Sequence, residues 1–238
     1  MSQSFLNAPE IVAHKVLKTK VLQVLSILGI CLSLYCVFMV VPNDRILGAV
    51  QRIFYFHVAS AFAAYLHLGI LMFASSFFLL TSQEGWDMFA KAAGGVAFLF
   101  CTVVLSSGMI WGHSSWHTWW RWEPRLVSFL ILWLTLLGYA VLRLFTEDNP
   151  RQRHFAAVLG ILAAVQVPVV IFSIKLLDHS EQLHPQVASG QGLRDVRFVW
   201  TLVATSVSLI ITSCWILFLR IEQFCLERLV LNLGKMKS

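Results

Sequence analysis

Six long stretches of the chain carry no charged residue and consist mainly of apolar side chains. They cover residues 21–41, 58–80, 92–112, 126–142, 155–174 and 198–219. At 1.5 Å per helical residue, each can cross about 30 Å of hydrocarbon, the fourth only just. Backbone groups at that depth need internal hydrogen bonds, so the stretches predict helices rather than strands or loops. The pattern predicts an all-α, polytopic integral membrane protein, with a single six-helix membrane domain over residues 1–238.

The composition supports this reading. Of the 238 residues, 58% are hydrophobic and 13% charged, and the mean hydropathy is +0.75. A soluble domain carries about a quarter charged residues, so this chain has about half the polar coat that such a domain needs. The five cysteines form no C-x-x-C pair, which excludes a redox dithiol or zinc clip of that kind and indicates small apolar side chains. Residues 1–20 have no apolar core ahead of their lysines, so we expect a cytoplasmic lead-in rather than a signal peptide.

The distribution of basic residues predicts the orientation. An even number of spans puts both termini on one side, and 11 of the 18 Lys and Arg residues fall on that side. By the positive-inside rule that side is cytoplasmic. The connections at about 42–57, 113–125 and 175–197 then face outward. We interpret the net charge of +6 as a sign of how the protein is oriented in the membrane. We expect membrane lipid around it and no binding of nucleic acid.

The third connection is rich in tryptophan. It reads WGHSSWHTWWRWEPRLVS over residues 111–128 and contains five of the nine tryptophans: Trp111, Trp116, Trp119, Trp120 and Trp122. An aromatic belt at the membrane interface explains one or two tryptophans per helix end, but not five in one connection. If this segment is helical, Trp116, Trp119 and Trp120 share a face. Such a face suits a large planar apolar ligand. Glu123 and Arg125 follow, with a pair between the two as the plain alternative.

Histidines on the outward side indicate which molecule the tryptophan segment would bind. His57 opens the second span, and His179 and His184 lie in the fifth connection. An isolated interfacial histidine is more often a polar cap, but neutral imidazole is also a standard axial ligand of haem iron. His67 lies ten residues into the second span, where a buried, hydrogen-bonded role is expected. Four outward arginines are candidate partners for haem propionates: Arg45, Arg52, Arg121 and Arg125.

These residues resemble a known family. The run from Trp111-Gly112 through Trp119-Trp120-Arg121-Trp122-Glu123-Pro124-Arg125 to Ser128 is similar to the tryptophan-rich "WWD" motif of haem-handling membrane proteins in cytochrome c biogenesis. Within that superfamily the length and six spans resemble the CcmC family of the cytochrome c maturation system. The segment Arg52–Val58 is similar to the family's first haem-histidine segment, and Leu183-His184 matches the second.

Three departures from the family pattern concern the site. Glu123 stands where the family usually has Asp, and Ala59 replaces a common proline after the first histidine. Leu176 and Leu177 stand where a tryptophan pair is usual, so His179 stays an alternative to His184.

The resemblance implies a function. Haem b would be held at the periplasmic face of a bacterial inner membrane, with His57 and His184 as axial ligands. The implied cofactor-binding residues are His57, His184, Trp111, Trp116, Trp119, Trp120, Trp122, Arg52, Arg121, Glu123 and Arg125. The haem would pass to the periplasmic chaperone CcmE, beside the ABC-transporter pair CcmA and CcmB and the small protein CcmD. The chain has no phosphate-binding G-x-x-x-x-G-K-[ST] loop, so a partner would hydrolyse any ATP, and we expect no enzymatic activity.

Two other function classes predict different sequence features. A b-type cytochrome that carries electrons generally buries its histidine pairs within the membrane, whereas His57 and His184 lie at its edge. A secondary transporter for a small solute predicts polar residues and broken helices near the midplane, yet the six stretches carry no charge.

Overall fold

The structure is a computed structural model that describes residues 8–44, 47–145, 149–173 and 195–235, with side chains described from 19 to 230 across the same gaps. Its elements are α2 (Ala8–Tyr35), the π-helical turn η1 (Cys36–Val40), the 3₁₀ turn η2 (Ala49–Gln51), α3 (Arg52–Thr81), α4 (Glu84–Trp116), α5 (Pro124–Leu144), α6 (Pro150–Phe172) and α7 (Val196–Lys235). Six helices in this described part are long and apolar enough to cross a membrane. The predicted all-α, six-span fold is confirmed.

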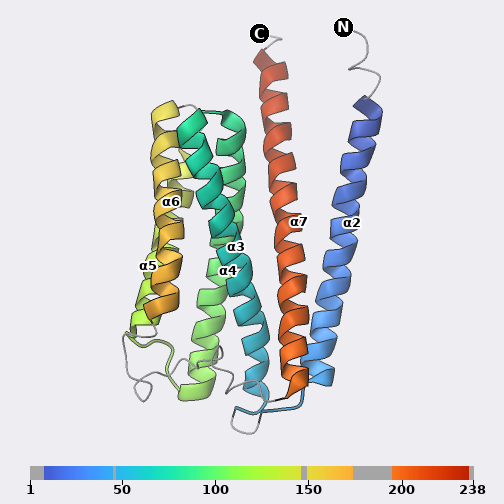
Figure 1. The fold of residues 1–238 in the computed structure, drawn as a ribbon, viewed down its shortest axis with the longest axis vertical. Helices are drawn as coiled ribbons and strands as arrows, with labels where there is room; N and C mark the ends of the chain where they lie inside the picture. The colour runs from blue at the N-terminus through green and yellow to red at the C-terminus, as the bar shows by residue number, and fades with distance from the viewer. Residues whose placement is uncertain (1–7, 45–46, 146–148, 174–194, 236–238) are drawn as a thin grey trace.

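Successive long helices run in opposite directions along one axis (Figure 1). Helix α2 pairs with α7, α7 also packs on α3 and α4, and α5 packs on α4 and α6. The start of α2 and the end of α7 lie together at what we call the terminal end (Figure 1). At the opposite end, α4 is joined to α5 through residues 117–123. We call this the tryptophan end.

The helices are longer than the charge-free stretches that predicted them. Helix α7 has 40 residues, which is about 60 Å at 1.5 Å per residue, or about twice the hydrocarbon thickness. Figure 1 shows α7 continuing past the other helices at the terminal end. Two helices begin with a proline, Pro124 and Pro150, a residue suited to a first turn because its missing N–H has no helical partner there.

Small residues let the central helices approach one another. The buried core includes many alanines from α3, α4 and α6, among them Ala63, Ala64, Ala93, Ala97 and Ala163. A side chain added at Gly94 of α4 would collide with the Tyr139 ring of α5. In a bilayer, where lipid is as apolar as leucine, close packing of small residues is a principal source of helix association.

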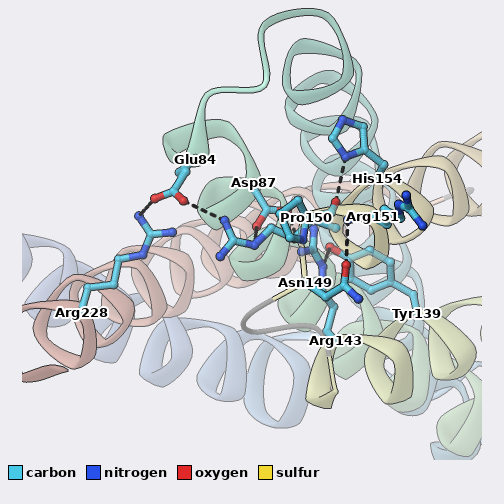
Figure 2. A network of polar contacts seen from close by, with 10 residues as sticks. Glu84, Asp87, Tyr139, Arg143, Asn149, Pro150, Arg151, His154 and Arg228 are labelled. Carbon is cyan, nitrogen blue, oxygen red and sulfur yellow. Dashed lines mark hydrogen bonds and ion pairs between the residues drawn. The ribbon is translucent and has the colours of Figure 1, made fainter. Parts of the chain in front are cut away.

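A polar network joins four helices at the terminal end (Figure 2). Arg143 of α5 donates to Asp87 of α4 at 2.6 Å and to the Tyr139 hydroxyl at 3.0 Å. Glu84 lies between Arg153 of α6, at 2.9 Å, and Arg228 of α7, at 3.0 Å. Arg143 directly follows the charge-free stretch 126–142, a place that predicts a connection, whereas the structure buries it within α5.

Helices α2 and α7 contact each other through small polar residues. The Ser26 hydroxyl donates to the Thr212 hydroxyl at 2.7 Å, and Gly29 lies directly against Ser208. Hydroxyl groups that hydrogen-bond between helices are a common form of association in membranes. Elsewhere α2 exposes large apolar side chains such as Val24, Leu28 and Leu32, as expected of a helix with a lipid-facing side.

Candidate functional site

A cavity opens at the tryptophan end between α3, α4, α5 and α6. The empty space between its walls, including the part open to solvent, is about 850 Å³. Its walls come from His57, Ala61 and Tyr65 of α3, several residues of α4, the segment after α4, and Arg125, Leu126 and Phe129 of α5, with Val170 of α6. Most of the wall is apolar or aromatic, which is typical of a site for a large organic ligand.

His57 is held in the wall by helix α4. Its Nδ1 atom lies 3.0 Å from the Ser107 hydroxyl oxygen, and its ring centroid lies 6.2 Å from that of Trp111. Trp111 is buried and also contacts Phe54, with centroids 6.2 Å apart, and Trp116, with centroids 5.5 Å apart. The start of α3 and the end of α4 therefore share one aromatic cluster, with the imidazole at its cavity side.

The tryptophan segment is not helical throughout. Helix α4 ends at Trp116 because His117 adopts a left-handed conformation with φ of 55°, and residues 117–123 are irregular. The expectation that Trp116, Trp119 and Trp120 share a helical face is therefore wrong. All three nevertheless line the cavity, together with Trp111.

Contacts within the segment fix its shape. The Thr118 hydroxyl donates to the Trp120 carbonyl at 3.0 Å. The rings of His113 and Trp119 stack with centroids 4.1 Å apart and planes 4° apart. Trp122 is 79% exposed and meets Trp120 edge-on. Four of the five tryptophans therefore form cavity wall, and the fifth projects outward.

The charged residues of the segment differ in their surroundings. Glu123 is only 6% exposed and pairs with Arg121, whose Nε lies 3.6 Å from its carboxylate. The alternative of a pair between Glu123 and Arg125 is not what the structure shows. Arg125 lines the cavity close to Tyr65, and in the part of the chain with described side chains no carboxylate lies within ion-pair distance of its guanidinium. The cavity therefore contains a cation suited to an anionic group of a ligand.

Most of the residues proposed from the sequence come together here. The cavity wall includes His57, Trp111, Trp116, Trp119, Trp120, Arg121, Glu123 and Arg125. Trp122 does not line it, and neither does Arg52, which donates to the Asn43 side chain at 3.1 Å and lies over the Phe38 ring. His179 and His184 lie outside the described residues.

The sequence did not point to three residues of the wall, Ala61, Tyr65 and Gly108, or to Ser107, which contacts His57 without lining the cavity. Tyr65 lies eight positions after His57, and Ala61 midway between them, so all three share one helical face. That spacing was available in the sequence. Ser107 and Gly108 gave no signal of their own, because only the packing of α4 against α3 brings them to the imidazole.

The donor set suits a planar metal complex better than a bare metal ion. Among the described residues, no three His, Cys, Asp or Glu side chains form a group able to hold a metal, and a bare transition metal usually takes three or four protein ligands. One imidazole beside broad aromatic walls and a cation fits a macrocycle that brings its own ligands and its own acidic groups. Trp120, another residue of the cavity wall, has a buried indole N–H with no acceptor among described atoms.

The chain is similar to proteins of one family. The sequence model of the family described as "Heme exporter protein C" matches residues 2–234. A curated relative of that name from Bradyrhizobium diazoefficiens is 28% identical over 197 residues, covering 83% of this chain and 75% of the relative. Those from Paracoccus denitrificans and Rhodobacter capsulatus are 35% and 33% identical and cover 52% and 54% of this chain. The chain spans about half the length of these last two relatives, 52% and 53%.

Proposed function

The chain belongs to the haem exporter protein C family, and on that premise we propose that it holds haem in the cavity at the tryptophan end and passes it to a haem chaperone. One observation carries the proposal. The same cavity wall contains His57, four tryptophan rings and the Arg125 guanidinium. These are the three kinds of group that haem requires: an axial nitrogen, an apolar surface and a cation for a propionate.

Each group has a separate role in holding the ligand. His57 supplies one axial ligand to haem b, and His184 supplies the second, with His179 as the alternative. Trp119 and Trp120 cover the porphyrin, while Arg125 receives a propionate. Arg121 forms an ion pair with Glu123, and Arg52 donates a hydrogen bond to Asn43. Both arginines therefore stabilise the surrounding chain more directly than they bind the ligand.

We propose that the protein binds haem and releases it, without making or breaking bonds within the haem. Transfer requires a site that captures haem and also gives it up. A cavity at the end of a helix bundle leaves one side of the ligand within reach of a partner. We propose that the partner is CcmE on the periplasmic side, and that CcmA, CcmB and CcmD complete the assembly.

This function requires one orientation of the bundle. The tryptophan end faces the periplasm, and both termini lie in the cytoplasm. The excess of basic residues on the side of the termini supports this arrangement. Residues 1–238 then act as one membrane domain of the bacterial inner membrane.

A transfer assay tests the proposal. Purified protein loaded with haemin is mixed with apo-CcmE, and the haem in each protein is measured after separation. We expect the wild type to donate haem and His57→Ala to donate little. A loaded protein that keeps its haem in the presence of CcmE but accepts electrons from a quinol would instead indicate a b-type cytochrome.

A further inference from the structure

The His57 imidazole rests on two consecutive residues of α4. The Ser107 hydroxyl oxygen lies 3.0 Å from Nδ1 of His57, and a side chain added at Gly108 would place its Cβ 3.1 Å from Cε1 of the same ring. The Ser107 hydroxyl therefore contacts Nδ1 of the ring, and Gly108, which has no side chain, lies next to the neighbouring Cε1 atom. These contacts join positions fifty residues apart in the sequence.

The hydrogen bonds of Ser107 determine the direction of its contact with His57. Its oxygen lies 2.6 Å from the Val103 carbonyl and 3.2 Å from the Val104 carbonyl. A serine hydroxyl has one proton, and these carbonyls, which can only accept, take it. The lone pairs of the Ser107 oxygen therefore face Nδ1, so Nδ1 carries the ring proton. The neutral imidazole then has its basic lone pair on Nε2.

Gly108 limits where the ring can sit. A Cβ at 3.1 Å from a carbon is tighter than ordinary contact, so any larger residue would push Cε1 away from α4. Cε1 lies between the two ring nitrogens, so moving it moves both of them. The contact between Nδ1 and the Ser107 hydroxyl would break, and Nε2 would point in a different direction. Gly108 also lines the cavity, and the space at this position is thus part of the binding site.

The group that accepts the hydrogen bond from Nδ1 of His57 also affects how strongly the ring binds iron. Metal-binding histidines commonly donate their second N–H to a carboxylate, a backbone carbonyl or water, which orients the ring and raises its basicity. Here the hydrogen-bond partners of the ring are neutral: the Ser107 hydroxyl and the backbone of Val104. Neutral partners orient the ring without the added basicity that a carboxylate provides. This suits a ligand that must be retained and then released.

We propose that Ser107 and Gly108 are positioning residues that fix the tautomer and the angle of His57 and thereby set the rate at which haem leaves the site. The proposal rests on the proposed function, because it takes His57 to be an axial ligand. Neither residue is required to touch haem iron. Both act through the imidazole.

The test measures haem loss from purified protein in detergent. Protein loaded with haemin is mixed with excess apomyoglobin, and the transfer rate is followed by absorbance. We expect Ser107→Ala and Gly108→Ala to lose haem roughly 10-fold or more faster, the size of effect typical of groups that orient a metal ligand. Ser107→Thr keeps a hydroxyl and should restore the slow rate.

Matched controls lie on the same helix. Ser106 is the next residue along α4, and its hydroxyl donates only to the Thr102 carbonyl among described contacts, so Ser106→Ala should lose haem at the wild-type rate. Gly95 has no atom within 4 Å of an added Cβ, so Gly95→Ala is the control for Gly108→Ala. Electron paramagnetic resonance spectra of the oxidised haem should show shifted g values in the Ser107 and Gly108 variants only, because these values depend on the orientation and basicity of the axial imidazole.

Two outcomes separate this inference from the proposed function. If His57→Ala leaves haem binding unchanged, the axial assignment itself is wrong. If His57→Ala accelerates haem loss while Ser107→Ala and Gly108→Ala behave like their controls, only the role of the two positioning residues is overturned. Adding Ser107→Ala to His57→Ala should change nothing further, because the serine acts through that ring.

Discussion

Arg143 and Asp87 form a buried ion pair between α5 and α4, with Nη1 and Oδ1 2.6 Å apart. Both side chains are almost excluded from solvent, and the Tyr139 hydroxyl accepts a second hydrogen bond from Arg143 (Figure 2). A buried pair is costly to desolvate, but removing one partner leaves the other charge without compensation. The pair therefore matters for the integrity of the bundle, at the end opposite the cavity.

The first prediction compares this buried ion pair with the exposed ion pairs of Glu84 at the same end of the bundle. Asp87→Ala should lower the free energy of unfolding by about 3–5 kcal/mol, the usual loss on removing one partner of a buried pair. Glu84→Ala breaks ion pairs at the same end, but Glu84 is largely exposed, so its loss should be about 0–1 kcal/mol. Denaturant titration of the purified protein measures both. Equal losses would mean that the Asp87 pair contributes no more than a surface pair.

Two adjacent glycines of α4 give a second test of packing. An alanine at Gly94 would collide with the Tyr139 ring, whereas an alanine at Gly95 would meet nothing within 4 Å. Overpacking typically costs about 1–3 kcal/mol, so Gly94→Ala should lower the thermal midpoint of the protein. Gly95→Ala should leave it unchanged or raise it, because alanine favours helix over glycine. A Gly94→Ala protein as stable as Gly95→Ala would contradict the described contact between α4 and α5.

Much of this architecture was readable from the sequence, because its signals are local. Charge-free stretches long enough to span a bilayer predicted each of the six helices, and the tryptophan cluster with His57 predicted the location of the cavity. Burial of Arg143 was not predictable, since it depends on Asp87, a residue 56 positions away on another helix. Ser107 was missed for the same reason. Its hydroxyl resembles any helix serine until α4 is packed against α3.

The tryptophans are expected to divide into two classes. Trp119 and Trp120 line the cavity, whereas Trp122 is exposed and does not. Trp119→Ala or Trp120→Ala should weaken haemin binding roughly 2- to 10-fold from lost aromatic contact, with additional loss from buried area. Phe replacements should be milder. Trp122→Ala should bind haemin as the wild type does, and an equal loss from all three variants would contradict the assignment of the cavity wall.

The orientation can be tested with single cysteines. In a background without the five native cysteines, Ser114→Cys would lie near the tryptophan end and Arg151→Cys near the terminal end, both at exposed positions. We expect a membrane-impermeant maleimide to label Ser114→Cys in intact cells and to label Arg151→Cys only after the membrane is opened. The reverse pattern would place the cavity in the cytoplasm and exclude direct transfer to a periplasmic chaperone.

The central claim is that the cavity beside His57 holds haem, and the absorption spectrum of the purified protein tests it most directly. His154 provides a matched control, because it is an exposed histidine near the terminal end that hydrogen-bonds the Pro150 carbonyl (Figure 2). Wild-type protein and His154→Ala, purified after expression with haem available, should show the same Soret band when oxidised and the same sharpened bands when reduced. His57→Ala should lose most of this absorption or show a changed ligand field. A His57→Ala protein with the wild-type spectrum in both oxidation states would contradict the account.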